Sequence, residues 1–245
     1  EQVIETLVSQ AAAATDDAVD KEELELDEDH RFLLRSATPL LKSRNAGVVV
    51  AVCNLQFYCG VSTVKIRKNM GKALSRIHRD RHFEIQNIVL VSIRTLARLC
   101  PSAFAQFLPD FFCNFQDPVF SKITKLDILV SLALDPPSIK IVLEELRTYT
   151  FQYPQDSDDL EFVCASIRAV GRVAEMAKVC YERKHRKAEA TTILLNCVFG
   201  ITTLSYACDH EIVVGETVIV IQRLLQMLNA SDETFDDPNQ VRQRA

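Results

Sequence analysis

The chain is poor in the residues that make tight turns, and it has no tryptophan. Its 245 residues include only 6 Gly and 8 Pro, and few of its segments alternate apolar with polar residues. β-Sandwiches, barrels and doubly wound sheets need many turn residues and alternating strands, so this composition disfavours them. Because 48% of the residues are hydrophobic, the chain can bury a large core, and we expect helices to form it.

The chain also lacks the short motifs that mark common catalytic and metal sites. It has no Gly-rich phosphate-binding loop and no Cys-x-x-Cys pair. His78 and His82 have helical spacing, but the only further candidate ligands nearby are two carboxylates, Asp80 and Glu84. We interpret these histidines as surface residues, because a zinc site needs more ligands of the right type. No nucleophile and base pair is recognisable, so we expect no enzyme activity, no metal and no cofactor.

A secretory leader and a long uncharged apolar run are not found either. The stretch 188–207 comes closest to such a run, but polar residues and Glu189 interrupt it, so we expect a packed helix there. Most of the eight cysteines lie among aliphatic residues, as small buried hydrophobes with free thiols do in the reducing cytosol. The sequence thus predicts a cytoplasmic protein whose contact with membranes is peripheral.

Apolar stripes with helical spacing recur along the chain. In the clearest, at 84–100, seven apolar residues follow one another at helical steps; they are Ile85, Ile88, Val89, Ile93, Leu96, Ala97 and Cys100. Similar stripes occur at 48–55, 123–130, 163–174 and 213–228, and a second set of helices is expected at about 31–42, 64–77, 103–112, 138–150 and 190–207. Each neighbouring pair of helices is predicted to form one hairpin.

Polar turns between these helices repeat at regular steps. Asn45, Asp80, Asp117, Asp158 and Asp209 can cap helices, and they follow one another at steps of 35, 37, 41 and 51 residues. A spacing near 40 is typical of HEAT or armadillo hairpins, which must stack because one hairpin cannot bury its apolar face alone. The last step is longer because of a polar insert, which we expect to form a loop at about 181–187. The predicted fold is an all-α HEAT/armadillo-type α-solenoid of stacked antiparallel helical hairpins over residues 29–230.

The two ends of the chain differ from this repeat pattern. Residues 1–29 hold eleven acids and one base, a net charge of −10, whereas the remaining residues hold 27 bases and 22 acids, a net charge of +5. We expect residues 1–14 to form a helix of a truncated preceding repeat and residues 15–28 to form a disordered acidic linker. Residues 231–245 form a polar tail, beyond which we expect further repeats.

A run of basic residues in the second hairpin is the main candidate for a binding site. It comprises Lys65, Arg67, Lys68, Lys72, Arg76, Arg79 and Arg81. Helical spacing places Lys65, Lys68, Lys72 and Arg76 on one face. One interpretation is a solvated outer face; the other is electrostatic contact with anionic lipid headgroups or an acidic partner. Nucleic acid is disfavoured, because the whole chain is acidic and no aromatic residues interleave with the cations.

Several segments resemble the β-adaptins in collinear order. They are residues 29–35 with 39–49, then 86–90, 125–129, 167–172 and 211–221. The acidic segment at 15–28 resembles an insertion that is characteristic of the β subunit of the third adaptor complex. The sequence departs from the family at the 181–187 insert and at Gly215-Glu216, and these departures affect the placement of loops more than the resemblance itself.

The resemblance implies a structural large-subunit scaffold of a heterotetrameric vesicle-coat adaptor. Such a subunit holds the medium and the other large subunit beside a small subunit, lies on Golgi or endosomal membranes and coated vesicles, and sorts proteins towards the lysosome or vacuole. Arf-type small GTPases recruit these complexes. Other subunits read the cargo motifs, so no cargo-reading residue is carried over to this chain.

Two other kinds of HEAT scaffold remain alternatives at this stage. A karyopherin-like receptor would need an acidic inner surface, which the mildly basic body disfavours. A phosphatase-type scaffold would have more uniform repeats than steps of 35 to 51 residues.

Overall fold

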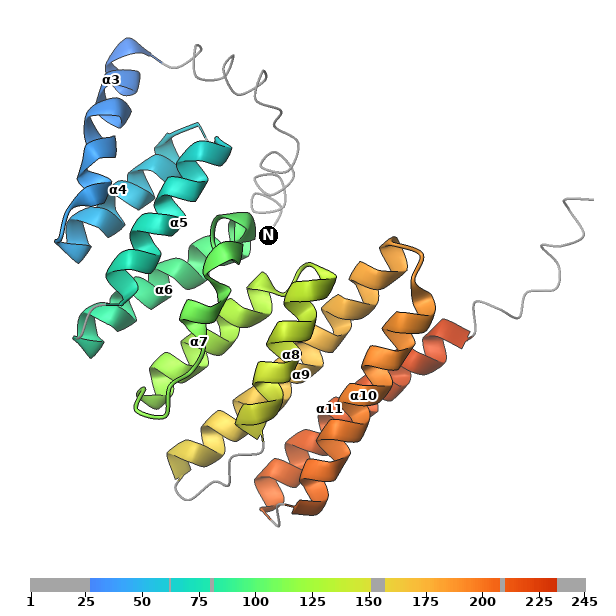
Figure 1. Cartoon of the computed structure of the whole chain (residues 1–245). Helices are drawn as coiled ribbons and strands as arrows, with labels where there is room; N and C mark the ends of the chain where they lie inside the picture. Colours follow the sequence, from blue (N-terminus) through green and yellow to red (C-terminus); the bar gives the residue numbers. More distant parts are fainter. Residues whose placement is uncertain (1–26, 62, 80–81, 151–156, 208–209, 233–245) are drawn as a thin grey trace, which may run out of the picture. The chain divides into compact units, whose positions relative to one another are not determined.

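Helices are the only regular elements among the residues that the computed structural model describes, which are 27–61, 63–79, 82–150, 157–207 and 210–232. The helices form two units, one ending at Leu132 and the other beginning at Ala133 (Figure 1). The expectations for residues 1–14, for most of the acidic linker and for the tail from residue 233 lie outside the described residues.

The first unit stacks three antiparallel pairs of helical segments. Its elements in chain order are α3 (Glu28–Ala37), the 3₁₀ helix η1 (Thr38–Lys42), α4 (Ala46–Cys59), α5 (Val64–His78), α6 (Phe83–Leu99), the 3₁₀ helices η2 (Pro101–Ala103) and η3 (Ala105–Phe111), and α7 (Val119–Leu132). The second helix of each pair packs against its counterpart in the next pair, α4 against α6 and α6 against α7.

The second unit contains two longer hairpins. Its elements are α8 (Pro136–Thr150), α9 (Ser157–Arg183), α10 (Lys187–Ala207) and α11 (Glu211–Asp232). Helix α9 packs against the other three helices of the unit, and α10 packs against α11. In both units, hairpins stacked side by side confirm the predicted all-α HEAT/armadillo-type α-solenoid (Figure 1).

Prolines change two of the predicted helices. Proline has no backbone N–H and cannot donate the i to i−4 hydrogen bond of an α-helix. The predicted helix at 31–42 therefore divides into α3 and η1, with Pro39 at the start of the 3₁₀ helix. The helix predicted at 103–112 is present as two 3₁₀ helices and not as one α-helix, because Pro101 begins η2 and Pro109 lies inside η3.

The buried face of α6 differs from the predicted stripe in one important residue. Val89, Leu90, Ile93, Leu96 and Ala97 are buried, whereas the side chain of Ile88 is 62% exposed. At 100° per residue Ile88 lies about 140° around the helix from Ile93, so both cannot face the same neighbour. The inclusion of Ile88 in the core stripe is therefore wrong, and Leu90 takes its place.

Helix α11 has apolar residues on more than one side, and the structure buries a different side from the predicted one. Val213, Thr217, Val220 and Leu224 are buried, while Val218 and Leu225 from the predicted stripe are exposed. These buried residues are four, three and four positions apart, so they lie on one face of α11. Helix α11 packs against α9 and α10. Because apolar residues lie on both sides of α11, periodicity alone could not predict which side is buried.

The turn between α9 and α10 is shorter than the loop expected at 181–187. Helix α9 continues through Arg183, because Tyr181 is buried against the unit. His185 has a φ of 56°, its N–H donates to the carbonyl of Glu182, and the N–H of Arg186 donates to the carbonyl of Tyr181. These two bonds form a Schellman motif, which ends the helix within three residues. The extra length of this repeat is thus mostly helical.

Two glycines allow helical segments to approach closely. A Cβ added at Gly71 of α5 would lie 2.1 Å from the carbonyl oxygen of Ala103 in η2, and one at Gly171 of α9 would lie 2.8 Å from Cγ1 of Val220 in α11. The second approach lets α9 and α11 pack closely. The backbone contact at Gly71 is the tighter one, and a carbonyl oxygen cannot rotate away as a side chain can.

We predict that Gly71→Ala destabilises the chain by about 1–3 kcal/mol, the usual effect of forcing an extra methyl group into a packed interface. The matched control is Gly215→Ala in α11, where an added Cβ meets nothing within 4 Å. Alanine is the better helix former, so the control should be neutral or more stable by up to about 1 kcal/mol. Urea unfolding followed by circular dichroism checks both variants, and equal midpoints would contradict the close approach.

Candidate functional site

The predicted basic face lies on α5, a helix whose first turn is capped by a local hydrogen bond. The side chain of Thr63 accepts from the backbone N–H of Ile66 at 3.1 Å, as an N-cap residue does. Met70, Ala73, Leu74 and Ile77 are among the residues that α5 buries. Their burial fixes the rotation of the helix and turns Lys65, Lys68, Lys72 and Arg76 outward, where all four are exposed.

The seven basic residues of the candidate site do not lie in equivalent environments. Lys65, Lys68, Lys72, Arg76 and Arg79 are exposed, whereas Arg67 is only 8% exposed. Arg67 points into the unit because it is two residues from Lys65, about 200° around the helix. Arg81 lies outside the described residues.

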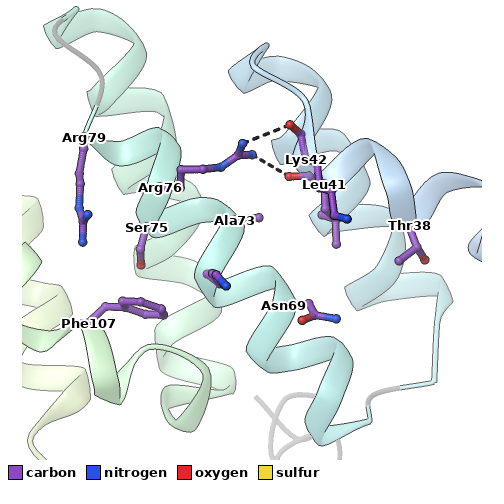
Figure 2. Close-up of a pocket in the computed structure, with 10 residues that line it drawn as sticks. Thr38, Leu41, Lys42, Asn69, Ala73, Ser75, Arg76, Arg79 and Phe107 are labelled. Carbon is purple, nitrogen blue, oxygen red and sulfur yellow. Dashed lines mark hydrogen bonds between the residues drawn. The ribbon is translucent and has the colours of Figure 1, made fainter.

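Arg76 joins its helix to the preceding hairpin. Its guanidinium donates hydrogen bonds to the backbone carbonyls of Leu41, Lys42 and Ser43, at 2.7, 3.1 and 3.0 Å, and Figure 2 shows the side chain reaching across to the end of η1. The last carbonyls of a helix have no partner within the helix, so a planar donor with several N–H groups satisfies them well. The exposed charge of Arg76 therefore also has a structural role.

Arg79 makes a similar contact with the following pair of helical segments. Its guanidinium forms an ion pair with Asp110 at the end of η3, with 2.7 Å between Nη2 and Oδ2. The part of the basic face that is turned outward without such a bridge is centred on Lys65, Lys68 and Lys72. Sequence reasoning missed the contacts of Arg76 and Arg79, because their partners lie 31 to 35 residues away in the sequence.

A groove of about 500 Å³ lies beside these arginines, between η1 and α5. Its lining is mainly apolar, with the buried side chains of Leu41 and Ala73 and the ring of Phe107, and its exposed edge carries four basic residues (Figure 2). The basic residues are Lys42, Lys72, Arg76 and Arg79. An apolar groove with a cationic edge can hold an extended segment that combines aliphatic and acidic side chains.

A buried ion pair anchors the segment between η3 and α7. Nζ of Lys125 lies 2.6 Å from Oδ2 of Asp117, and the two side chains are 2% and 6% exposed. Lys125 also donates to the carbonyl of Phe112, and Asp117 accepts from the backbone N–H of Asn114. Both charges are therefore paired and hydrogen-bonded, the condition under which burial of an ion pair is tolerated.

His78 lies next to this ion pair, at the end of α5. Its ring stacks on Phe111 with 5.6 Å between the ring centroids, and Nε2 is 3.3 Å from the carbonyl oxygen of Asp110. Burial, and secondly the positive charge of Lys125, lower the pKa of His78 to about 4. His78 is thus a neutral core residue, and its interpretation as a surface histidine is wrong.

The polar residues that interrupt apolar helices elsewhere also have structural roles. The side chain of Asn45 accepts from the N–H of Val48 and caps α4. Arg168 pairs with Glu216 at 2.7 Å, which joins α9 to α11. A second ion pair, between Arg223 and Glu175, joins the same two helices.

Three of the cysteines are buried thiols with raised pKa values. Burial raises the pKa of Cys53 to about 12, of Cys100 to about 11 and of Cys197 to about 12, so these thiols stay protonated and unreactive. Among the described residues there is no disulfide and no cluster of three metal-ligating side chains. In this same part of the chain no helix has the length and apolar character needed to cross a membrane.

Comparison with known proteins gives a consistent set of relatives, although no family model matches the chain. The chain is 39% identical over 212 residues to the AP-3 complex subunit beta of Dictyostelium discoideum, which covers 86% of this chain and 17% of that protein. It is 37% identical over 207 residues to the AP-3 complex subunit beta-1 of Mus musculus, covering 84% of this chain and 17% of that protein. The AP-3 complex subunit beta-1 of Homo sapiens is 36% identical over 202 residues, which cover 82% of this chain and 16% of that protein.

The chain therefore spans about one sixth of the length of the curated relatives it matches. Among solved structures, a homology model of the full-length AP-3 complex in an intermediate open conformation overlaps 79% of this chain and 35% of that chain. The TM-score is 0.49 and the sequence identity is 15%, a level of similarity that carries no further argument.

We predict that Asp117→Asn destabilises the chain by about 3–5 kcal/mol, because it leaves the ammonium group of Lys125 buried without a carboxylate. The matched control is Asp135→Asn, since Asp135 is 72% exposed and lies 3.9 Å from Lys184. An exposed pair of this kind contributes less than about 1 kcal/mol. Urea unfolding of the two variants checks the difference, and similar losses in both would show that the buried pair has no special role.

The neutral state of His78 predicts a loss of stability in mild acid. An unfolded chain binds a proton at this histidine below about pH 6.5, whereas the folded chain does so only near pH 4. The unfolded state therefore gains protons first, and we expect the free energy of unfolding to fall by about 2 kcal/mol between pH 7 and pH 5 from this group.

The measurement compares urea unfolding at pH 7 and pH 5 for the original chain and for His78→Phe, which keeps an aromatic ring against Phe111. Other titrating groups act equally in both proteins, so the variant should lose about 2 kcal/mol less over this range. An equal loss in the two proteins would rule out His78 as the cause.

Proposed function

The chain belongs to the β-adaptin family, in the branch of the AP-3 complex β subunits, and from this membership we propose that it is part of a structural scaffold in a vesicle-coat adaptor complex. The observation that carries the proposal is the 39% identity over 86% of the chain to a subunit of this kind. The complex would sort proteins from the endosome or Golgi towards the lysosome or vacuole. This chain would lie on the cytoplasmic side of those membranes.

The mechanism we propose is geometric and needs no chemistry from the chain. The stacked hairpins of each unit would present a surface on which the medium and the other large subunit are held, and obligate subunits of this kind share extensive interfaces. Ion pairs between neighbouring helices, such as Arg168 with Glu216, support it by keeping the stack in register. In this proposal residues 29–230 form the solenoid, residues 15–28 an acidic linker, and the chain is not an enzyme.

An affinity pull-down tests this function and separates it from the two other HEAT scaffolds. With the chain as bait in a eukaryotic cell extract, we expect medium, small and large adaptor subunits to be recovered. Recovery of nucleoporins with a Ran-type GTPase, or of a phosphatase catalytic chain, in place of adaptor subunits would overturn the proposal.

We also propose that the outward part of the basic face contacts an anionic surface, either a membrane or an Arf-type GTPase. Lys65, Lys68 and Lys72 support this proposal, because they are exposed along one side of α5. Each cation near a charged membrane contributes about 1 kcal/mol. Arg76 is left out of the test, because its removal would also release the carbonyls of Leu41, Lys42 and Ser43.

The corresponding prediction uses the triple variant Lys65→Glu, Lys68→Glu and Lys72→Glu. Binding to vesicles with about a quarter phosphatidylserine should fall at least about tenfold in a flotation assay, because three attractive charges become repulsive. A control with the same change in net charge reverses the exposed residues Lys140, Arg183 and Lys187 of the second unit. Equal binding by both variants, with helicity unchanged, would leave the solvated face as the interpretation of α5.

A further inference from the structure

Acidic and basic residues are separated along the sequence at the start of α3. Residues 1–29 hold eleven acids and one base, whereas residues 30–79 hold ten lysines and arginines and not one Asp or Glu. The two segments are adjacent in sequence and opposite in charge. Residues 30–79 include nearly all of α3 and the whole of η1, α4 and α5, and they supply most of the lining of the groove between η1 and α5.

The groove and the acidic segment are complementary in their apolar residues as well as in charge. The groove combines an apolar lining from Leu41, Ala73 and Phe107 with a basic edge. Residues 16–26 have the sequence Asp-Asp-Ala-Val-Asp-Lys-Glu-Glu-Leu-Glu-Leu, in which aliphatic residues lie among six acids. An occupant of this chemistry would place leucine or valine against the lining and carboxylates beside Lys42 and Lys72, the two lysines on the edge.

The acidic segment is also close enough to reach the groove. Helix α3 begins at Glu28 and has 10 residues, so it is about 15 Å long. The groove begins directly after it, at Thr38. Residues 16–26 span up to about 36 Å when extended, which is more than enough to run back along α3 into the groove.

We propose that residues 16–26 dock in the groove between η1 and α5 of the same chain. Because the segment is tethered, its effective concentration at the groove is of millimolar order, and an intrinsic Kd of about 1 mM suffices for half occupancy. The carboxylates contact the exposed edge, so the contact weakens as salt screens the charges. While docked, the segment excludes other acidic ligands from the groove.

Zero-length carbodiimide cross-linking of the full chain tests this contact, because it joins a carboxylate to a lysine amine only when the two touch. We expect cross-links within monomers to connect acids of 16–25 mainly to Lys42 and Lys72, as read by mass spectrometry. Their yield should fall several-fold in 0.5 M NaCl, since the Debye length shortens to a few Å. The test uses neither membrane nor partner, so its outcome is separate from that of the proposed function.

Two variants with the same change in charge distinguish docking in the groove from a general electrostatic attraction between the acidic segment and the basic residues. Asn69→Glu adds an acid to the lining of the groove and leaves both lysines in place, whereas Asn54→Glu adds the same charge on an exposed position of α4. We expect Asn69→Glu to lower the yield at least about threefold and Asn54→Glu to leave it unchanged. Equal yields in the two variants, or cross-links as frequent at Lys140 of α8 as at Lys42 and Lys72, would overturn the proposal.

Discussion

Within each unit, neighbouring helical pairs cover one another's apolar sides. In α6, Val89, Leu90, Ile93 and Leu96 are buried because α7 packs on one side and α4 and α5 lie on the other. A single pair could not remove these side chains from water, and this is why stacking, more than the stability of any one helix, holds the fold together. The close approach at Gly71, where the backbones of α5 and η2 meet, shows how tightly adjacent pairs fit.

Burial of apolar side chains does not by itself fix how the helical segments are placed, and polar contacts add this specificity. Arg76 satisfies the carbonyls at the end of η1, and the buried pair of Lys125 and Asp117 fixes the segment before α7. A shift between the first two pairs would leave the carbonyls at the end of η1 without Arg76, and a shift of the segment before α7 would leave the charge of Lys125 buried and unpaired. The proposed scaffold function requires a surface of fixed shape, and these contacts support it.

The same basic residues that bridge the pairs also give the first two hairpins their positive charge. Lys65, Lys68 and Lys72 extend this charge outward, and the acidic segment before α3 carries the opposite charge. Within one unit, the chain therefore combines an anionic segment with a cationic groove. The proposed docking of residues 16–26 and the proposed contact with anionic partners would use neighbouring parts of one surface.

The sequence by itself determined the helical class, the repeat of about 40 residues and the β-adaptin resemblance, because periodicity, turn spacing and motif order are local or collinear properties. It also placed Lys65, Lys68 and Lys72 on one face of a helix. Only the tertiary structure decided that Ile88 is exposed, that His78 is buried and that Arg76 and Arg79 bridge separate pairs. These outcomes depend on groups about 30 residues or more away in the sequence, and a pattern within one helix contains no information about which neighbour will face it.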